Sequence, residues 1–218
     1  MTKDEAIAIT GGLSQTSKMP CKSFSTPTLA CVTGYKLAQV PGTVCSKCYA
    51  CKGNYAKYAN NIEPAQHARL DALLNADIGL WAPAMTLLIG KDPHFRWFDS
   101  GDLPGVDALR RICYVCDFTP WTQHWLPTRE VGFVRQWFKE SLVPIPKNLT
   151  IRISATYPDV PVKIPVPLLG YAGIARANVH HEKPPVGHEC PAPKQGNQCG
   201  ACRACWDRTV PVVSYKEH

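Results

Sequence analysis

The spacing of apolar side chains predicts two helices in the first half of the chain. In the segment 64–76, Leu70, Leu73 and Leu74 recur at helical intervals behind a proline that suits a first helical turn. In the segment 80–90 the apolar residues again follow the helical period, and the closing glycine is a typical stop signal. We therefore expect a pair of helices here.

Beyond residue 93 the pattern changes to short apolar runs that alternate with amphipathic segments. The amphipathic segments predict helices at 104–112 and 129–142. The apolar runs predict strands at 94–98, 113–118, 149–155 and 166–175. Alternation of this kind is typical of an α/β fold with a mainly parallel sheet, either open or closed into a partial barrel.

Glycine and proline recur through the first sixty residues without any sustained period, which predicts a loop-rich segment. We therefore expect a single domain with three parts: a loop-rich segment over 1–60, an α/β core over 61–180 and a cysteine-rich segment over 181–218.

Functional residues of α/β folds gather where parallel strands end. The predicted strands place six polar residues on this rim: Asp99, Ser100, Gly101, Asp102, Asp117 and Thr119. Carboxylates there could bind a substrate or a metal, which makes Asp99, Ser100 and Asp102 the candidates for catalysis. Because Asp, Ser and Gly also form turns, a purely structural turn explains the sequence DSGD equally well.

The composition is that of a folded, proline-rich protein, and the 218 residues carry a formal net charge of +7. Positive charge of this size would ordinarily point to nucleic acid or an acidic surface as a partner. However, thiolates that hold a metal would lower the total, and Lys and Arg are scattered along the chain. A solvated basic surface is therefore the better interpretation.

The chain shows no sign of export or of a membrane anchor. Its N-terminus lacks the apolar core of a secretory signal, and no apolar run approaches the length of a membrane span. We expect a cytoplasmic protein that makes no membrane contact.

Eleven cysteines are the strongest chemical signal in the sequence. An odd number cannot pair completely within one chain, and disulfides are rare in a reducing compartment. Metal binding is therefore the leading explanation.

Two runs of three cysteines share the spacing C-x2-C-x2-C. The first lies near the C-terminus, and Cys190 precedes it to give the candidate ligand set Cys190, Cys199, Cys202 and Cys205. Three thiols in this register favour an iron–sulfur cluster over the paired knuckles of a zinc site. The second run, near the N-terminus, consists of Cys45, Cys48 and Cys51, and either Cys21 or Cys31 could complete a set of four there. The spacing leaves open whether the two sets form separate centres or share one.

Other candidate residues have structural explanations of equal or greater weight. Cys113 and Cys116 lie in an apolar run and are expected to be buried thiols without a metal. Three histidines and two tryptophans could contact a cofactor or a base, but solvation of the histidines and core packing of the tryptophans are the commoner outcomes: His180, His181, His188, Trp121 and Trp125.

The N-terminal run resembles the cysteine loop of radical S-adenosylmethionine enzymes, which hold a cluster on a partial α/β barrel. Those loops commonly read C-x3-C-x2-C with an aromatic residue before the last cysteine. This run is one residue shorter, and Tyr49 follows Cys48 directly. The resemblance implies a radical-enzyme-like barrel and S-adenosylmethionine as a candidate cofactor.

Four stretches together resemble a family of bacteriophage proteins, the gene product 88 family: SKMP (17–20), CSKCYACKGNY (45–55), RWFDSGD (96–102) and the terminal C-P…C-x2-C-x2-C-W. The resemblance spans most of the chain. It implies a phage-encoded protein of the bacterial host cytoplasm with an iron–sulfur centre. The position of Cys51 varies in the family pattern, which shifts weight to Cys31, Cys45 and Cys48.

We therefore expect a protein that binds one [4Fe–4S] cluster or two through cysteine thiolates. Full cysteine ligation would favour electron transfer or a structural role, whereas an open iron would favour binding of a substrate or of S-adenosylmethionine. The alternative is a zinc module that binds nucleic acid or a host protein. The sequence does not identify the redox partner, the substrate or any enzymatic reaction.

Overall fold

A computed structural model describes residues 1–217 of the chain, apart from the side chain of Asn54. Its strands are β1 (Ser14–Gln15), β2 (Lys22–Phe24), β3 (His94–Trp97), β4 (Gln123–Thr128), β5 (Leu149–Ser154), β6 (Ile174–His180), β7 (His188–Glu189) and β8 (Val212–Lys216). Its α-helices are α1 (Lys3–Thr10), α2 (Val32–Ala38), α3 (Gly53–Lys57), α4 (Ala59–Asn75), α5 (Ile78–Ile89), α6 (Val106–Phe118) and α7 (Val131–Glu140).

The strands form one open sheet with the order β1-β2-β3-β4-β5-β6-β8-β7. Only the β1–β2 pair is antiparallel, and the remaining pairs of the described sheet are parallel. The sequence correctly predicts a mainly parallel α/β fold, and of its two forms the sheet takes the open one.

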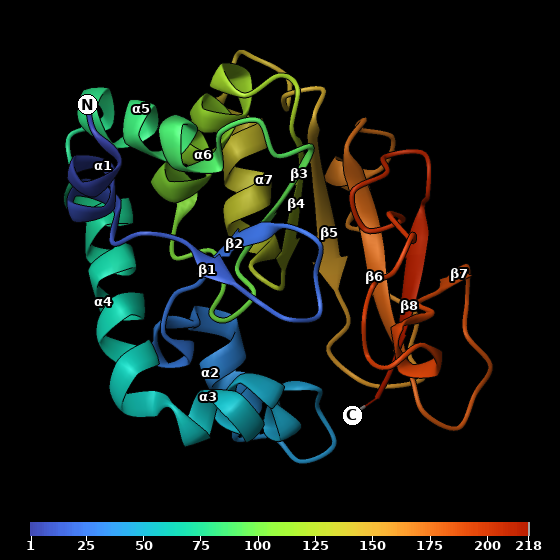
Figure 1. The fold of residues 1–218 in the computed structure, drawn as a ribbon. Coiled ribbons are helices and arrows are strands. Elements are labelled where there is room, and N and C mark those ends of the chain that lie inside the picture. Colours follow the sequence, from blue (N-terminus) through green and yellow to red (C-terminus); the bar gives the residue numbers. More distant parts are fainter. Residues whose placement is uncertain (218) are drawn as a thin grey trace.

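From β2 to β6 the order in space follows the order in the chain. Right-handed crossovers between such neighbours bring their helices to one side of the sheet. Figure 1 shows α4, α5, α6 and α7 gathered on that side. We call it the helix face, and the other side the cysteine face.

Alternation along each strand gives the two faces different chemistry. Phe95 and Trp97 of β3 enter the helix-face core together with Leu126 of β4 and Ile151 of β5. The intervening residues point the other way, and Trp125 packs there against cysteines of the C-terminal segment. A hydrophobic core therefore supports the sheet from one side, while the cysteine segment covers the other.

The predicted helices at 64–76 and 80–90 are confirmed as α4 and α5, and Gly90 follows α5 directly. The strands predicted at 94–98 and 149–155 are confirmed as β3 and β5. The helices predicted at 104–112 and 129–142 are confirmed as α6 and α7, with shifted ends.

Two strand predictions are wrong. Residues 113–118 continue α6, because Leu109, Ile112 and Cys116 extend its helical period and a short apolar run does not distinguish a strand from a buried helix. In 166–175, prolines and two glycines with positive φ produce a 3-10 turn at Val166–Leu168, and only Ile174 and Ala175 join a strand.

The first sixty residues contain more regular structure than their composition predicts. Thr2 and Glu5 form a capping box at the start of α1, and β2 pairs with β3 inside the sheet. The sheet thus draws strands from all three predicted segments. Among residues 1–217, none of the helices combines the length and the apolar character that a bilayer crossing requires.

Candidate metal centres

Four thiols of the N-terminal part of the chain lie together, and we call Cys31, Cys45, Cys48 and Cys51 the N-terminal group. Consecutive 3-10 turns bring three of them into register: the amide of Cys48 donates to the carbonyl of Cys45 at 3.1 Å, and the amide of Cys51 donates to that of Cys48 at 3.2 Å. Cys48 lies between the two turns, so the three thiols follow one another along a short, tightly turned stretch of backbone.

Cys31 joins this set from the start of α2. A methyl group built onto Gly34 would lie 3.6 Å from the sulfur of Cys31 and 3.7 Å from that of Cys45. Cys48 lies within electrostatic reach of Cys31, Cys45 and Cys51. The four sulfurs therefore surround one region, with Cys51 at its exposed side.

This group lies at the carboxyl ends of the parallel strands, where α/β folds place their sites. The amide of Val44 donates to the carbonyl of Thr156, just after β5, at 2.9 Å. After β4, the carboxylate of Glu130 accepts hydrogen bonds from the amide of Thr33 at 2.6 Å and from its hydroxyl at 2.7 Å. These hydrogen bonds hold the segment that carries the N-terminal group against the ends of β4 and β5.

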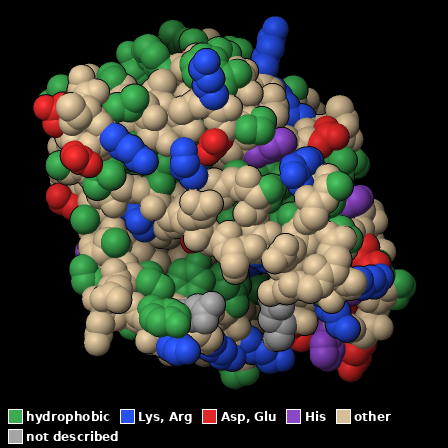
Figure 2. All heavy atoms as spheres, viewed as in Figure 1, with side chains coloured by type: hydrophobic (Ala, Val, Ile, Leu, Met, Phe, Trp, Pro, Cys, Tyr) green, Lys and Arg blue, Asp and Glu red, His purple; other side chains and the backbone are tan. Residues whose placement is uncertain are grey.

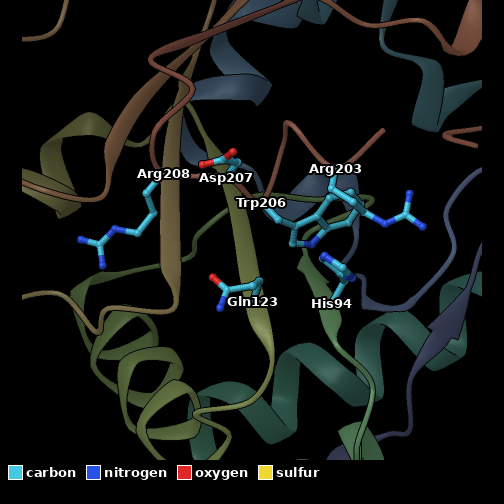
Figure 3. Close-up of a pocket in the computed structure, with 6 residues that line it drawn as sticks. All are labelled: His94, Gln123, Arg203, Trp206, Asp207 and Arg208. Atoms are coloured by element: carbon cyan, nitrogen blue, oxygen red, sulfur yellow. The ribbon is translucent and has the colours of Figure 1, made fainter. Parts of the chain in front are cut away.

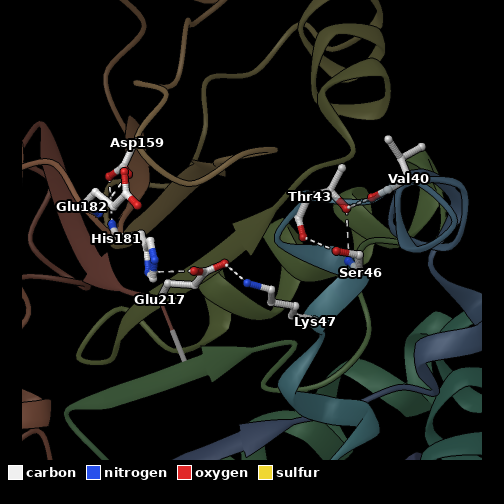
Figure 4. Close-up of polar contacts among 8 residues, drawn as sticks. All are labelled: Val40, Thr43, Ser46, Lys47, Asp159, His181, Glu182 and Glu217. Carbon is white, nitrogen blue, oxygen red and sulfur yellow. Dashed lines mark hydrogen bonds and ion pairs between the residues drawn. The ribbon is translucent and has the colours of Figure 1, made fainter.

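Further polar contacts fix the loop itself (Figure 4). The carboxylate of Glu217 lies 3.2 Å from Nζ of Lys47 and 3.0 Å from Nδ1 of His181. The hydroxyl of Thr43 donates to the carbonyl of Val40 at 2.9 Å and accepts from the amide of Ser46 at 3.1 Å. The thiols are therefore carried by an anchored loop and not by a free one.

The environment of the N-terminal group favours neutral thiols in the absence of a metal. Burial raises the pKa of Cys31, Cys45 and Cys48, and the nearby carboxylate of Asp102 adds to this at the first two. Residues 6–62 contain six lysines and no Asp or Glu, and Figure 2 shows basic side chains along the edge formed by α2 and α3. These lysines would offset the negative charge of a metal–thiolate centre.

Cys190, Cys199, Cys202 and Cys205 form a second set, which we call the C-terminal group. Backbone hydrogen bonds place its members: the amide of Cys199 donates to the carbonyl of Lys18 at 2.9 Å, and that of Cys190 to the carbonyl of Ser214 at 2.8 Å. All four pack with Cys21 in one cluster on the cysteine face.

Cys190 lies nine residues before the other three cysteines of the C-terminal group, and the structure places it beside them. Cys190 lies within electrostatic reach of Cys199 and Cys205. Burial is the main cause that raises the pKa of Cys205 to about 12, and likewise that of Cys21. His188 also belongs to this neighbourhood, because its Nε2 lies 3.3 Å from the sulfur of Cys202.

Arg152 organises the loop that carries this group. Its side chain is fully buried, and burial lowers its pKa. The guanidinium donates to five backbone carbonyls, those of Ala204, Cys205, Asp207, Val210 and Arg176. An arginine inside the strand sequence LTIRISA was a signal for this role, since a charged residue within a buried strand needs a partner.

A cavity of about 330 Å³ lies beside the C-terminal group, at the amino ends of β3 and β4. Figure 3 shows the indole of Trp206 and the imidazole of His94 close together in it, with Arg208 extending on the other side. Its lining residues are His94, Gln123, Arg203, Trp206, Asp207 and Arg208. Burial lowers the pKa of His94, as does the charge of Arg203.

Among the described residues, no three His, Cys, Asp or Glu side chains converge closely enough to hold a single metal ion. A tetrahedral zinc with Zn–S bonds of about 2.3 Å requires sulfurs about 3.8 Å apart. In a cluster each thiolate binds a different iron, so the sulfurs lie farther apart. Cysteine thiolates are ligands of zinc and of iron–sulfur clusters alike, so the residues of both groups suit either kind of centre.

The DSGD turn follows β3 at the carboxyl-end rim of the sheet, as the sequence predicts, and the structure brings it near the N-terminal group. Phe98 has a positive φ of 52°, a strained value for a bulky residue that is often found at functional sites. Asp99, Ser100 and Asp102 are buried. The carboxylate of Asp102 accepts three hydrogen bonds, yet burial raises its pKa to about 6.

Two tyrosines from the loop of the N-terminal group donate hydrogen bonds to Asp99. The hydroxyl of Tyr55 donates to its carboxylate at 2.6 Å, and that of Tyr49 donates to its backbone carbonyl. Tyr49 and Tyr55 thus join the DSGD turn to the loop that carries the N-terminal group, which sequence spacing could not reveal.

Asp117 and Thr119 are not on this rim, because residues 113–118 are helical. They precede β4 and therefore lie at the opposite end of the sheet, where Thr119 contacts His124 at 2.8 Å. Cys113 and Cys116 are buried in the helix-face core as predicted, although α6 directs them to one side of the helix.

The remaining tryptophan and histidine candidates differ in burial and in their partners. Trp125 is buried beside the C-terminal group, whereas Trp121 is exposed and donates to the carbonyl of Gly90. His180 lies 3.9 Å from Glu189, and His181 pairs with Glu217.

Fold and sites together define an α/β protein whose open parallel sheet carries two groups of cysteine thiols, one at the strand ends and one across the cysteine face. A family model described as Gene product 88 matches residues 3–208. The chain therefore belongs to the gene product 88 family of bacteriophage proteins. Comparison with curated proteins and with solved structures gives no match.

Proposed function

We propose that this protein binds [4Fe–4S] clusters at its two cysteine groups. The observation that carries the proposal is the collection of eight thiols into two sets of four, one set within mutual electrostatic reach and the other in one packed cluster. All eleven cysteines of the described chain are free thiols, which agrees with a reducing compartment such as the host cytoplasm.

The two groups differ in what they could do. The C-terminal group supplies four thiols, of which Cys205 is buried and the others are half-buried, and a cluster that all four ligate would suit electron transfer or stabilisation of the loop. The N-terminal group lies at the strand ends beside Asp99 and Ser100, and its Cys51 is exposed. Weak ligation by Cys51 would leave an iron open to a substrate or to S-adenosylmethionine, as in radical enzymes.

The chain's own residues have defined parts in this proposal. The eight cysteines would provide the thiolate ligands, and the cluster would supply one-electron chemistry. Arg152 holds the C-terminal loop, while Glu130 and Thr43 hold the N-terminal segment. Tyr55 would orient the carboxylate of Asp99 toward a bound substrate.

Anaerobic purification followed by iron, sulfide and zinc analysis tests this proposal. We expect about eight irons and about eight sulfides per chain, together with broad visible absorption. Replacing Cys45 and Cys48 by Ser should remove about half of the iron, and replacing Cys202 and Cys205 by Ser should remove the other half. The matched control replaces the buried Cys113 and Cys116 by Ala and should keep the full content. A colourless protein with stoichiometric zinc and no sulfide would overturn the proposal.

A further inference from the structure

Arg96 of β3 lies on the cysteine face, between the two cysteine groups. Toward the N-terminal group, its Nη2 donates to the hydroxyl of Tyr49 at 3.1 Å and to the carbonyl of Phe98 at 3.3 Å. Tyr49 directly follows Cys48 in the chain. On this side Arg96 therefore contacts the residue next to Cys48, which is a predicted ligand.

Toward the C-terminal group, the same guanidinium lies over Trp125, with 4.4 Å between the guanidinium carbon and the ring centroid. Trp125 stacks on Tyr215 at 6.4 Å between ring centroids, and the hydroxyl of Tyr215 lies 3.1 Å from the sulfur of Cys205. Contacts therefore run without interruption from Tyr49 through Arg96, Trp125 and Tyr215 to Cys205.

Neighbouring oxygens maintain the positive charge of Arg96. Burial disfavours that charge, yet the oxygens of Tyr49 and Asp99 outweigh this and raise the pKa of Arg96. Arg96 is thus a permanent positive charge in a poorly solvated position.

We propose that Arg96 tunes the centres at both cysteine groups and so links them into one redox unit. This inference rests on the proposed function, because it requires a centre at each group. Reduction adds one electron to a centre; when dithionite is the reductant, its S–S bond dissociates into two sulfur dioxide radical anions, and each donates one electron and becomes sulfur dioxide, which hydrates to sulfite. A buried positive charge favours the added electron, so a guanidinium shared by both groups raises both reduction potentials.

Redox titration of the loaded protein, followed by electron paramagnetic resonance, tests this proposal. The Cys45/Cys48 and Cys202/Cys205 double serine variants assign one signal to each group. We expect Arg96→Gln to lower the midpoint potentials of both signals, and Arg96→Lys to lower them less because it keeps the charge. Arg135→Gln removes a charge from the exposed side of α7 and should leave both potentials unchanged.

Two milder variants keep the test decisive if Arg96→Gln does not fold. Tyr215→Phe removes the hydroxyl beside Cys205 and should lower only the C-terminal signal, because hydrogen bonds to sulfur raise the potential. Tyr49→Phe removes the hydroxyl that Arg96 binds and should shift only the N-terminal signal.

The outcomes separate this inference from the proposed function. Wild-type protein without iron and sulfide would overturn the proposed function. If Arg96→Gln protein is iron-replete and at least one of the two midpoint potentials is unchanged, the proposed role of Arg96 is overturned. The proposal that both groups bind clusters is then unaffected. If only the milder variants fold, unchanged potentials in both of them would have the same meaning.

Discussion

At the residue scale, His124 is a neutral imidazole enclosed in the helix-face core. It stacks on Trp97 with 6.1 Å between ring centroids, and its Nε2 lies 2.8 Å from the hydroxyl of Thr119. That hydroxyl donates to the carbonyl of Val115 at 2.7 Å, so His124 must donate to it through Nε2. Nδ1 finds no partner among the described residues, and burial lowers the pKa of His124 to about 3.

This imidazole predicts a loss of stability in acid. Its folded pKa lies below its ordinary value of 6.5, so its contribution is present above that pH and is lost as the pH falls toward 3. At pH 4.5 the free energy of unfolding should be lower than at pH 7.5 by about 3 kcal/mol from this group alone. Denaturant titrations of the wild type and of His124→Gln at both pH values measure it, because the variant should lose this pH dependence.

Asp102 contributes a pH dependence of stability opposite in sign to that of His124. Because its folded pKa is raised to about 6, its contribution is present below its ordinary pKa and is lost as the pH rises through 6. Because this contribution is common to the wild type and His124→Gln, it cancels when the two proteins are compared. Parallel pH dependence of the two proteins would contradict the role given to His124.

Arg152 should be among the most sensitive residues of the chain. Arg152→Met removes the side-chain donor from five backbone carbonyls, of which those of Ala204 and Asp207 keep a backbone donor, and we expect the free energy of unfolding to fall by about 3 kcal/mol. The cluster proposed for the C-terminal group should also be lost. Arg135→Met on the exposed side of α7 is the matched control and should change stability by less than about 0.5 kcal/mol. Equal stability of the two variants would show that the carbonyls find other donors.

At the element scale, the turn after β3 depends on Gly101. Its φ is +79°, and an added Cβ would lie 2.0 Å from the hydroxyl oxygen of Thr26. We expect Gly101→Ala to lower the free energy of unfolding by at least about 2 kcal/mol, because backbone strain and the clash add. Gly132→Ala in α7 meets nothing within 4 Å and should raise stability by up to about 1 kcal/mol. Thermal unfolding of both variants checks the contrast, and a neutral Gly101→Ala would contradict the close approach.

Local pattern predicts those elements whose period is unambiguous. The helix α5 follows from its apolar spacing and from Gly90, and β5 follows from strict alternation. The strand β4 could not be found in this way, because Pro127 lies inside it and proline is rare in central strands. The six-residue run 113–118 was misassigned because only its continuity with Leu109 and Ile112 identifies it as helical.

At the scale of the whole molecule, the cysteines were predictable as two groups but their surroundings were not. Spacing predicts the run of three cysteines in each set but leaves the fourth member open, Cys190 in one set and Cys21 or Cys31 in the other. It could not place the N-terminal group beside Asp99, because that contact joins residues about 50 positions apart through Tyr49 and Tyr55. The roles of Arg96 and Arg152 likewise depend on which face of the sheet each strand residue occupies.

The position of β8 between β6 and β7 has a consequence for folding. The chain makes β7 before β8, yet β7 pairs only with β8 in the described sheet, so β7 must wait for a later segment. The amide of Cys190 is bound by Ser214 of β8 and shares this delay. We therefore expect the C-terminal thiols to come together only when β8 is in place, and to remain open to oxidation until then. A newly made chain should therefore be most vulnerable to oxidants during the interval before β8 inserts.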